Sequence, residues 1–224
     1  MVNLKIFGNE IYLVFPKISG IFILELENNR KLYIMTTIEQ TKDFTSDYLT
    51  SDEIHRLCRY FNKLGNHRME LLCLFGTKTL LRYSDMKRIR WFDVLDKDVL
   101  VLNEKKTQKR RTITLSQSLK NDIRKTYNQL QPPMDGFIFK YSLQHTNVLL
   151  KEGGKDCKIR NKNISTHSFR KSGGRYVYET FGCSDDSLIK LSLLLNHSTT
   201  SITRRYLSIQ KEEIEDIYQS FDVF

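Results

Sequence analysis

The hydrophobic pattern of the chain changes its period near Tyr48, and this change limits the folds open to it. Before that point, runs rich in Ile, Val, Tyr and Phe predict strands at residues 11–15, 20–27 and 31–39. Residues 27–30, Glu-Asn-Asn-Arg, predict a turn between the last two strands. After Tyr48 the apolar residues recur at helical spacing. The pattern therefore predicts an α+β protein.

We expect two parts: a short β-rich segment at residues 1–47, interpreted as a small meander, and a mostly helical domain at residues 48–224. Thr50 followed by acidic residues predicts a helix start, because a hydroxyl cap and negative charge suit the positive end of the helix dipole. Gly153 and Gly154 are interpreted as part of a basic loop. Two strands joined by a strongly basic turn predict a small antiparallel hairpin at residues 99–115. Further helices are predicted at residues 68–79, 119–130, 165–181, 185–195 and 198–206, with a short one from Ser84 and another along the acidic C-terminal tail.

Positive charge is confined to the second part of the chain. The 224 residues hold 36 Lys and Arg against 26 Asp and Glu, a net charge of +10. The first 47 residues contribute −1 and the remainder +11. Much of the excess lies in two blocks, residues 82–111 and 149–175. Blocks of this kind indicate a bounded surface for an acidic partner, most often nucleic acid.

The four cysteines form no CxxC pair and show no metal-ligand spacing with histidine. The first twenty residues mix charges and a proline into the apolar run, unlike a secretory signal peptide. No apolar stretch reaches the roughly 20 residues that a membrane helix needs. We expect reduced thiols, no bound metal, no membrane segment and an intracellular protein.

Six side chains in the basic part are candidates for chemistry, although each taken singly suits an ordinary structural role. A single arginine after a helix is usually a cap, and a single lysine in a turn is usually solvated. The order and spacing of the whole set are far more specific. The six are Arg82, Lys106, His167, Arg170, His197 and Tyr206.

In this order the six residues resemble the catalytic set of the tyrosine recombinases, the phage-integrase family. Residues 79–82, Thr-Leu-Leu-Arg, resemble the box of the first arginine, with Leu in place of Gly. Residues 167–170, His-Ser-Phe-Arg, match the box of the histidine and second arginine. Residues 194–198, Leu-Leu-Asn-His-Ser, resemble the Leu-Gly-His-Ser box, with Asn in place of Gly. Tyr206 stands nine positions after His197, which is the usual spacing in the family.

The basic turn supplies the sixth residue of the resemblance. Lys106 in Lys-Thr-Gln-Lys matches the catalytic lysine of the family's β-hairpin. Lys105 and Lys109 are close enough in sequence to be alternatives, since the register of the turn decides. The resemblance covers residues 48–224 and implies a mostly helical recombinase catalytic domain.

The resemblance also implies what each residue does. Arg82 and Arg170 would hold the non-bridging phosphate oxygens, and Tyr206 would attack phosphorus to form a covalent phosphotyrosine. His167 would accept the tyrosine proton, Lys106 would protonate the leaving 5′-oxygen, and His197 would hydrogen-bond the phosphate. The function implied is site-specific DNA cleavage and rejoining, or DNA integration, with no metal ion, ATP or other cofactor.

The implied partner is double-stranded DNA at a specific site, bound by a homo-oligomer, a tetramer, in the cytoplasm of a bacterium or on phage or plasmid DNA. The apolar face of the C-terminal helix is either core or a surface that docks on a neighbouring subunit. Its residues are Ile214, Ile217, Tyr218 and Phe221. The residues expected to bind the DNA backbone are Lys105, Lys109, Arg110, Arg111, Lys171 and Arg175.

Two alternatives to the recombinase are a DNA-binding regulator on the same fold that no longer cuts, and a type IB topoisomerase. The first 47 residues motivate the regulator, because they do not resemble the helical core-binding domain that precedes most such catalytic domains. From this we expect a chain that holds DNA on one side only, relies on a partner, or is a reduced recombinase.

Overall fold

A computed structural model describes residues 3–7, 10–14, 21–26, 30–35 and 45–223. Side-chain surroundings are described from residue 45 onward, apart from residues 210, 211, 222 and 223. The chain divides into two compact units, Met1–Thr45 and Ser46–Phe224.

The first unit is a four-stranded sheet with the strand order β1-β2-β4-β3. The strands are β1 (Asn3–Phe7), β2 (Glu10–Val14), β3 (Ile21–Leu26) and β4 (Arg30–Met35). β1 is not among the predicted strands, and the predicted turn lies largely at residues 27–29, outside the described residues. The prediction of a meander is wrong, because β4 returns between β2 and β3 and pairs with β2 in parallel.

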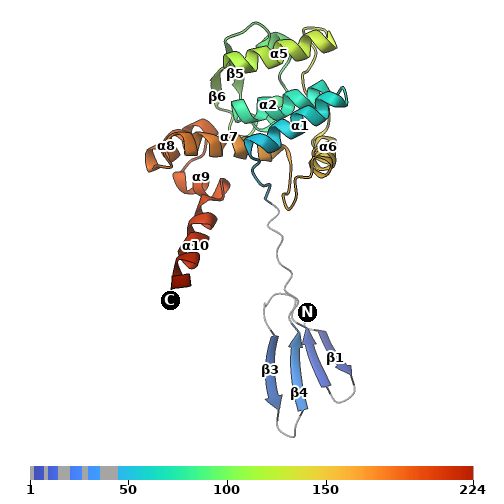
Figure 1. Ribbon diagram of the computed structural model, residues 1–224, viewed down its shortest axis with the longest axis vertical. Coiled ribbons are helices and arrows are strands. Elements are labelled where there is room, and N and C mark those ends of the chain that lie inside the picture. Colours follow the sequence, from blue (N-terminus) through green and yellow to red (C-terminus); the bar gives the residue numbers. More distant parts are fainter. Residues whose placement is uncertain (1–2, 8–9, 15–20, 27–29, 36–44, 224) are drawn as a thin grey trace. The chain divides into compact units, whose positions relative to one another are not determined.

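The second unit is built around α2 (His67–Thr79), which packs against α1 (Ser51–Lys63), α5 (Gln117–Leu130) and α7 (Thr166–Thr180). Because neighbours surround it, α2 buries residues on most of its circumference. Figure 1 shows this helical body, with the hairpin of β5 (Val99–Asn103) beside it. The mostly helical prediction for this part is confirmed.

Local signals in the sequence place several of these elements correctly. Thr50 caps α1 in a reciprocal capping box with Glu53, as predicted. Ser116 and Ser165 likewise cap α5 and α7 through their side chains. The predicted hairpin is also confirmed, with β5 paired in antiparallel fashion to β6 (Arg110–Thr114). Two short helices, α3 (Tyr83–Met86) and α4 (Trp91–Val94), lie between α2 and the hairpin.

The prediction of a loop at Gly153 and Gly154 is wrong, because both lie inside α6 (Leu143–Asp156). A Cβ at Gly153 would come within 3.2 Å of side-chain atoms of Leu57 and Phe61 in α1. A Cβ at Gly154 would overlap Ile164. The glycines therefore lower helix propensity locally but allow close packing of α6, which outweighs that cost.

The C-terminal part has its own small core, which includes Leu80, Leu188, Leu191 and Leu207. It contains α8 (Asp185–Leu195), α9 (Thr200–Tyr206), α10 (Ile209–Gln219) and a 3-10 turn at Ser220–Val223. The apolar residues of this last segment, from Ile214 to Phe221, are 47% to 71% exposed, so they lie outside the core of the second unit as the structure describes it. In the described part of the chain, no helix is both long and apolar enough to cross a membrane.

Candidate active site

The C-terminal ends of two helices, α2 and α8, lie at the site. Leu80 ends α2 and Asn196 ends α8, and both adopt left-handed backbone conformations, with φ of 55° and 53°. These are the two positions at which the sequence motifs have Leu and Asn in place of Gly. Left-handed helix caps favour glycine because it has no Cβ, and asparagine tolerates them better than leucine.

Arg170 joins these two helix ends. Its guanidinium donates hydrogen bonds to the carbonyls of Leu80 and Leu195, the latter at 2.6 Å. The carbonyls at helix C-termini lack intrahelical partners and carry partial negative charge, so they suit a cation. Burial lowers the pKa of Arg170 to about 10, with a smaller lowering from the charge of Arg82. Arg170 is 2% exposed and still charged at neutral pH.

Arg82 directly precedes α3, and its side chain reaches the hairpin. Its Nη1 donates to Oε2 of Glu104 at 3.1 Å. Both side chains are shielded from solvent, Glu104 completely. The pair therefore fixes the arginine against the base of the basic turn.

Glu104 is a residue of this site that the sequence motifs do not reveal. Its carboxylate accepts hydrogen bonds from Arg82, Thr107, Arg111 and Asn196 at 2.8 to 3.1 Å. Burial alone would raise its pKa, but the hydrogen bonds from Asn196, Arg111 and Thr107, with the charge of Arg82, outweigh it and hold the pKa at about 2. The only signal in the sequence is a single acidic residue at the start of a strongly basic turn.

Lys106 lies in the turn between β5 and β6 and is exposed. Its charge contributes to lowering the pKa of both His167 and His197. Neither Lys105 nor Lys109 is among the main charges acting on these histidines. Of the three lysines of the turn, Lys106 is therefore the one whose charge acts most on the two histidines.

The two histidines lie among cations, which favours the neutral form of both rings. Burial, and then the charges of Arg170 and Arg82, lower the pKa of His197 to about 4. Its Nδ1 is 3.0 Å from Oγ1 of Thr203. His167 lies in the first turn of α7 and is exposed at the rim. Reduced hydration of its ring, and then the charges of Arg170 and Arg82, lower its pKa as well.

Tyr206 is the last residue of α9 and points back into the same site. Its ring meets that of His197 edge-on, with centroids 5.3 Å apart. The hydroxyl is buried and has no hydrogen-bond partner of normal geometry. Burial raises the pKa of Tyr206, and the charge of the adjacent Arg170 opposes that rise.

The structure thus brings all six candidate residues to one region of the second unit. The six candidates for DNA-backbone binding divide into two groups. Lys105, Lys109 and Arg110 are exposed on the hairpin. The other three are engaged in protein contacts: Arg111 with Glu104 and the Thr79 carbonyl, Lys171 over the Tyr206 ring at 5.5 Å, and Arg175 with Glu179 and Glu212.

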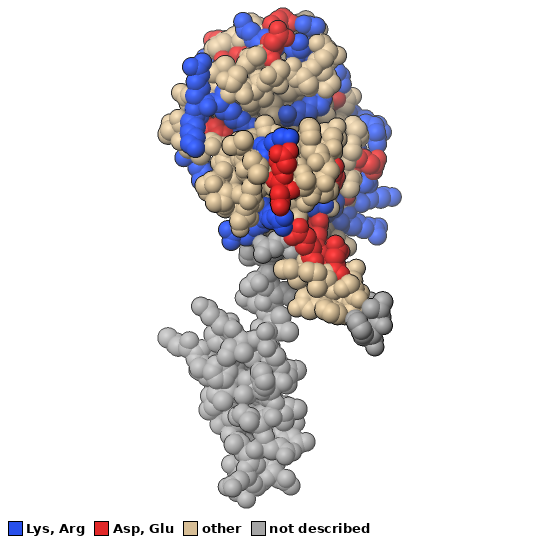
Figure 2. Space-filling view, turned by 90° about the vertical axis from the view of Figure 1, so that its left-hand side faces the viewer, with Lys and Arg blue, Asp and Glu red and all other residues tan. Residues whose placement is uncertain are grey.

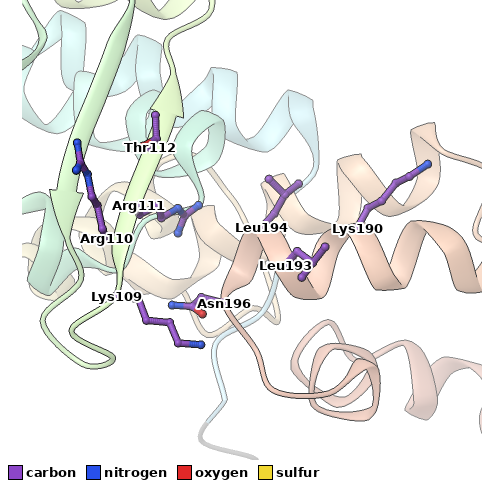
Figure 3. Close-up of a pocket in the computed structure, with 8 residues that line it drawn as sticks. All are labelled: Lys109, Arg110, Arg111, Thr112, Lys190, Leu193, Leu194 and Asn196. Carbon is purple, nitrogen blue, oxygen red and sulfur yellow. The ribbon is translucent and has the colours of Figure 1, made fainter.

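On the face of the second unit that Figure 2 shows, acidic side chains interrupt the basic ones. Figure 2 shows Lys and Arg side chains gathered in patches on one face of the second unit, with acidic side chains between them. A pocket of about 510 Å³ lies between the hairpin and α8. Figure 3 shows Lys109, Arg110 and Arg111 lining it from the hairpin, and Leu193, Leu194 and Asn196 from α8. Among the residues with described surroundings, no group of three His, Cys, Asp or Glu side chains is placed to hold a metal ion.

Residues 47–213 match a family model described as the phage integrase family. The chain belongs to this family. The match covers most of the helical unit and all six candidate residues, so the resemblance to the tyrosine recombinases seen in the motifs is confirmed. A relative in Bacillus subtilis (strain 168), the probable integrase/recombinase YoeC, is 30% identical over 163 residues, which cover 70% of this chain and 86% of YoeC.

Solved structures of two recombinases and an integrase share the fold. XerA recombinase superposes with a TM-score of 0.59 at 18% identity, covering 79% of this chain and 66% of that one. XerH bound to a palindromic difH substrate superposes with a TM-score of 0.59 at 16% identity, covering 88% of this chain and 61% of the XerH chain. A lambda integrase dimer bound to a COC' core site superposes with a TM-score of 0.55 at 18% identity, covering 72% of this chain and 59% of the integrase chain. The prediction that the second unit has the fold of a recombinase catalytic domain is therefore confirmed.

Proposed function

We propose that this chain is a site-specific DNA recombinase that cuts and rejoins strands through a covalent phosphotyrosine at Tyr206, without a metal ion or ATP. The observation that carries the proposal is the meeting of Tyr206 with Arg170 and His197 inside one unit. A nucleophile beside a fixed guanidinium and a neutral imidazole suits attack on a phosphodiester. On this proposal residues 48–224 form the catalytic domain, and each subunit supplies its own tyrosine.

Arg82 and Arg170 are assigned to the phosphate. The transition state of phosphoryl transfer gathers negative charge on the non-bridging oxygens, and guanidinium groups hold such oxygens at any working pH. Arg170 is anchored by two helix ends and Arg82 by Glu104. Anchored donors need little reorganisation when the charge develops, which is the property that makes such stabilisation effective.

The proton transfers are assigned to the remaining residues. As the Tyr206 oxygen bonds to phosphorus, its proton passes to His167, whose lowered pKa leaves the ring neutral and able to accept it. The bond to the 5′-oxygen breaks, and Lys106 supplies the proton for that oxygen. His197 donates to the phosphate through Nε2, since Nδ1 faces Thr203. The phosphotyrosine keeps the bond energy, so the 5′-hydroxyl of a second strand can reverse the step.

The partner on this proposal is duplex DNA at a specific site in the cytoplasm. Lys105, Lys109 and Arg110 are exposed on the hairpin and suit backbone phosphates. The XerH structure shows a site-specific recombinase bound to a palindromic difH substrate, and the lambda integrase structure shows a dimer bound to a COC' core site. We extend this to a homotetramer on DNA. The exposed apolar face of α10 is assigned to a neighbouring subunit, because such a face otherwise remains in water.

A nicked suicide duplex tests the proposal. The site is first located by footprinting on DNA that flanks the gene, and a nick beside the cleavage point lets the short leaving strand diffuse away. The wild-type chain should then accumulate a covalent adduct that survives denaturing electrophoresis. Tyr206→Phe should bind the same DNA and form no adduct.

Three results would contradict the proposal. An adduct with Tyr206→Phe would exclude Tyr206 as the nucleophile. Salt-dependent, site-specific binding by the wild type without any adduct would point to a regulator that does not cut. Relaxation of supercoiled plasmid without a specific site would point to a topoisomerase.

A further inference from the structure

Asn196 replaces a glycine that the family motif prefers, and its side chain makes contacts that glycine cannot make. Its Nδ2 donates to Oε2 of Glu104 at 2.8 Å and to Oγ1 of Thr107 at 3.0 Å. Figure 3 shows Asn196 at the end of α8, beside the hairpin. The left-handed backbone of a helix cap thus carries a side chain that links α8 to the basic turn.

The carboxylate of Glu104 accepts one of the two hydrogen bonds from Asn196. Its Oε2 accepts from Arg82, Thr107 and Asn196, and its Oε1 accepts from Arg111. The main chain of Glu104 also closes the turn. Its N–H donates to the Lys109 carbonyl at 3.0 Å, and its carbonyl accepts from the N–H of Gln108 at 2.9 Å. A single buried residue therefore connects the turn to α3, β6 and α8.

Contacts with Glu104 and Asp85 hold the residues on both sides of Lys106. Thr107 follows Lys106 and bonds to the carboxylate, while Lys105 precedes it and donates its N–H to Oδ1 of Asp85 at 2.7 Å. The Lys106 side chain itself is exposed, and its charge lowers the pKa of His167 and His197. Hydrogen bonds thus fix the turn on both sides of Lys106, while the lysine side chain itself is exposed to solvent.

We propose that Glu104, acting through Asn196 and Thr107, is a positioning residue that presents Lys106 to the leaving 5′-oxygen. The inference rests on the proposed function, because it assigns a role within that reaction. It differs from a purely structural role in one respect. Loss of the hydrogen bonds from Asn196 to Glu104 and Thr107 should slow the proton transfer to the leaving oxygen. It should affect DNA binding and the attack by Tyr206 much less.

A sulfur-substituted substrate separates these effects. When the phosphorus–oxygen bond breaks, the electron pair passes to the 5′-oxygen, which needs a proton from Lys106. With sulfur in the bridging 5′ position, the thiolate leaves without that proton, because a thiol has a pKa of about 8.5. A variant that only misplaces Lys106 should therefore recover on the sulfur substrate, whereas a variant that misplaces Arg82 or Tyr206 should not.

Asn196→Gly is the principal variant, because glycine suits the left-handed backbone and leaves Glu104 paired with both arginines. The control is Gln131→Gly, which changes another left-handed helix cap, with φ of 42°, at the end of α5. We expect Asn196→Gly to cleave the ordinary suicide duplex about 10- to 100-fold more slowly, as small misplacements of catalytic groups do. On the sulfur substrate its rate should lie within about threefold of wild type, given that the lysine is then not needed. Lys106→Ala should show the same recovery.

Proteolysis of the free protein provides a readout that needs no DNA. Lys105, Lys106, Lys109 and Arg110 are exposed trypsin sites in the turn. Loss of the two Asn196 hydrogen bonds should raise the rate of cutting at the turn about 30-fold, since each such bond is worth about 1 kcal/mol. Gln131→Gly should leave that rate unchanged.

The outcomes are distinguishable. Equal losses on the oxygen and sulfur substrates, or no loss on either, would overturn the inference while leaving the recombinase assignment intact. A turn that trypsin cuts equally fast in wild type and Asn196→Gly would also overturn it. Failure of the wild type to form an adduct on both substrates would overturn the proposed function, and the role of Lys106 with it.

Discussion

Glu104 places a negative charge among the cations assigned to the phosphate. Its carboxylate is fully buried and its pKa is about 2, against 4.5 for an ordinary glutamate. A carboxylate whose pKa is lower in the folded state stabilises the fold above its unfolded pKa, and this contribution is lost as the pH falls through the folded pKa. The relevant window therefore lies between about pH 4.5 and pH 2.

Glu104→Gln should remove this contribution, because an amide cannot pair with Arg82 and Arg111 as an anion does. The free energy of unfolding in urea should fall by on the order of 3 kcal/mol at pH 7. The difference between wild type and variant should shrink as the pH is lowered from 5 to 2. A difference that stays constant over this range would show that the charge of Glu104 is not the stabilising feature.

Leu80 shows how two residue-scale effects compete. Its left-handed backbone costs a leucine about 1–2 kcal/mol that glycine would not lose. Its side chain is 5% exposed and belongs to the small C-terminal core. Deleting a buried leucine typically costs about 2–5 kcal/mol, so burial outweighs the backbone strain.

Leu80→Gly should therefore destabilise the fold although it restores the usual family residue. We expect a net loss of about 1–3 kcal/mol in urea unfolding. Asn196→Gly, at a position that is only half-buried, should change stability much less. If Leu80→Gly were more stable than wild type, backbone strain would be the dominant effect at this helix end.

At the scale of elements, the contact between α2 and α7 places Arg170. Gly173 of α7 lies against the end of α2, and a Cβ there would overlap the carbonyl of Thr77 and come within 2.5 Å of a methyl group of Leu80. The Leu80 carbonyl is one of the two acceptors of Arg170. A glycine on α7 thus allows the close approach that anchors the arginine three residues earlier.

Gly173→Ala should push these helices apart, because main-chain atoms of Thr77 cannot move aside as a flexible side chain can. Overpacking should cost about 1–3 kcal/mol of stability, despite the better helix propensity of alanine. It should also slow DNA cleavage by the refolded variant. Tyr176→Ala on the exposed face of α7 is the matched control, and an equally small effect of both changes would contradict the close-packing argument.

Elements also differ in how well the sequence predicts them. The helix starts at Thr50, Ser116 and Ser165 are predictable, since a cap is made by residues a few positions apart. The glycine pair in α6 misleads, because its reason is the packing against α1 and Ile164, which are distant in sequence. The parallel pairing of β2 and β4 is likewise a non-local arrangement.

At the scale of the whole molecule, the apolar face of α10 has no cover in the described part of the chain. Figure 1 shows α10 extending away from the helical body, and Figure 2 shows acidic side chains where this segment leaves it. Ion pairs from Arg175 and Arg204 to Glu212 and Glu213 hold its first turn. The helix is therefore anchored at one end and exposed along its apolar side.

The double variant Ile217→Ser with Tyr218→Ser tests the proposed contact between subunits. Both side chains are exposed, so the fold and its free energy of unfolding should change little. Assembly on DNA, measured by size-exclusion chromatography with the target duplex, should shift toward smaller complexes. Assembly equal to that of wild type would contradict a docking role for this face.

The sequence by itself determined the family, the helical character of residues 48–224 and the identity of the six candidate residues, because motif spacing and helix periodicity are local properties of a chain. The tertiary structure decided which neighbours those residues have. It turned Arg111 inward and placed Glu104 at the base of the turn, where both side chains pair. A buried carboxylate with four donors from four parts of the chain leaves no spacing rule in the sequence, because only the packed fold brings those donors together.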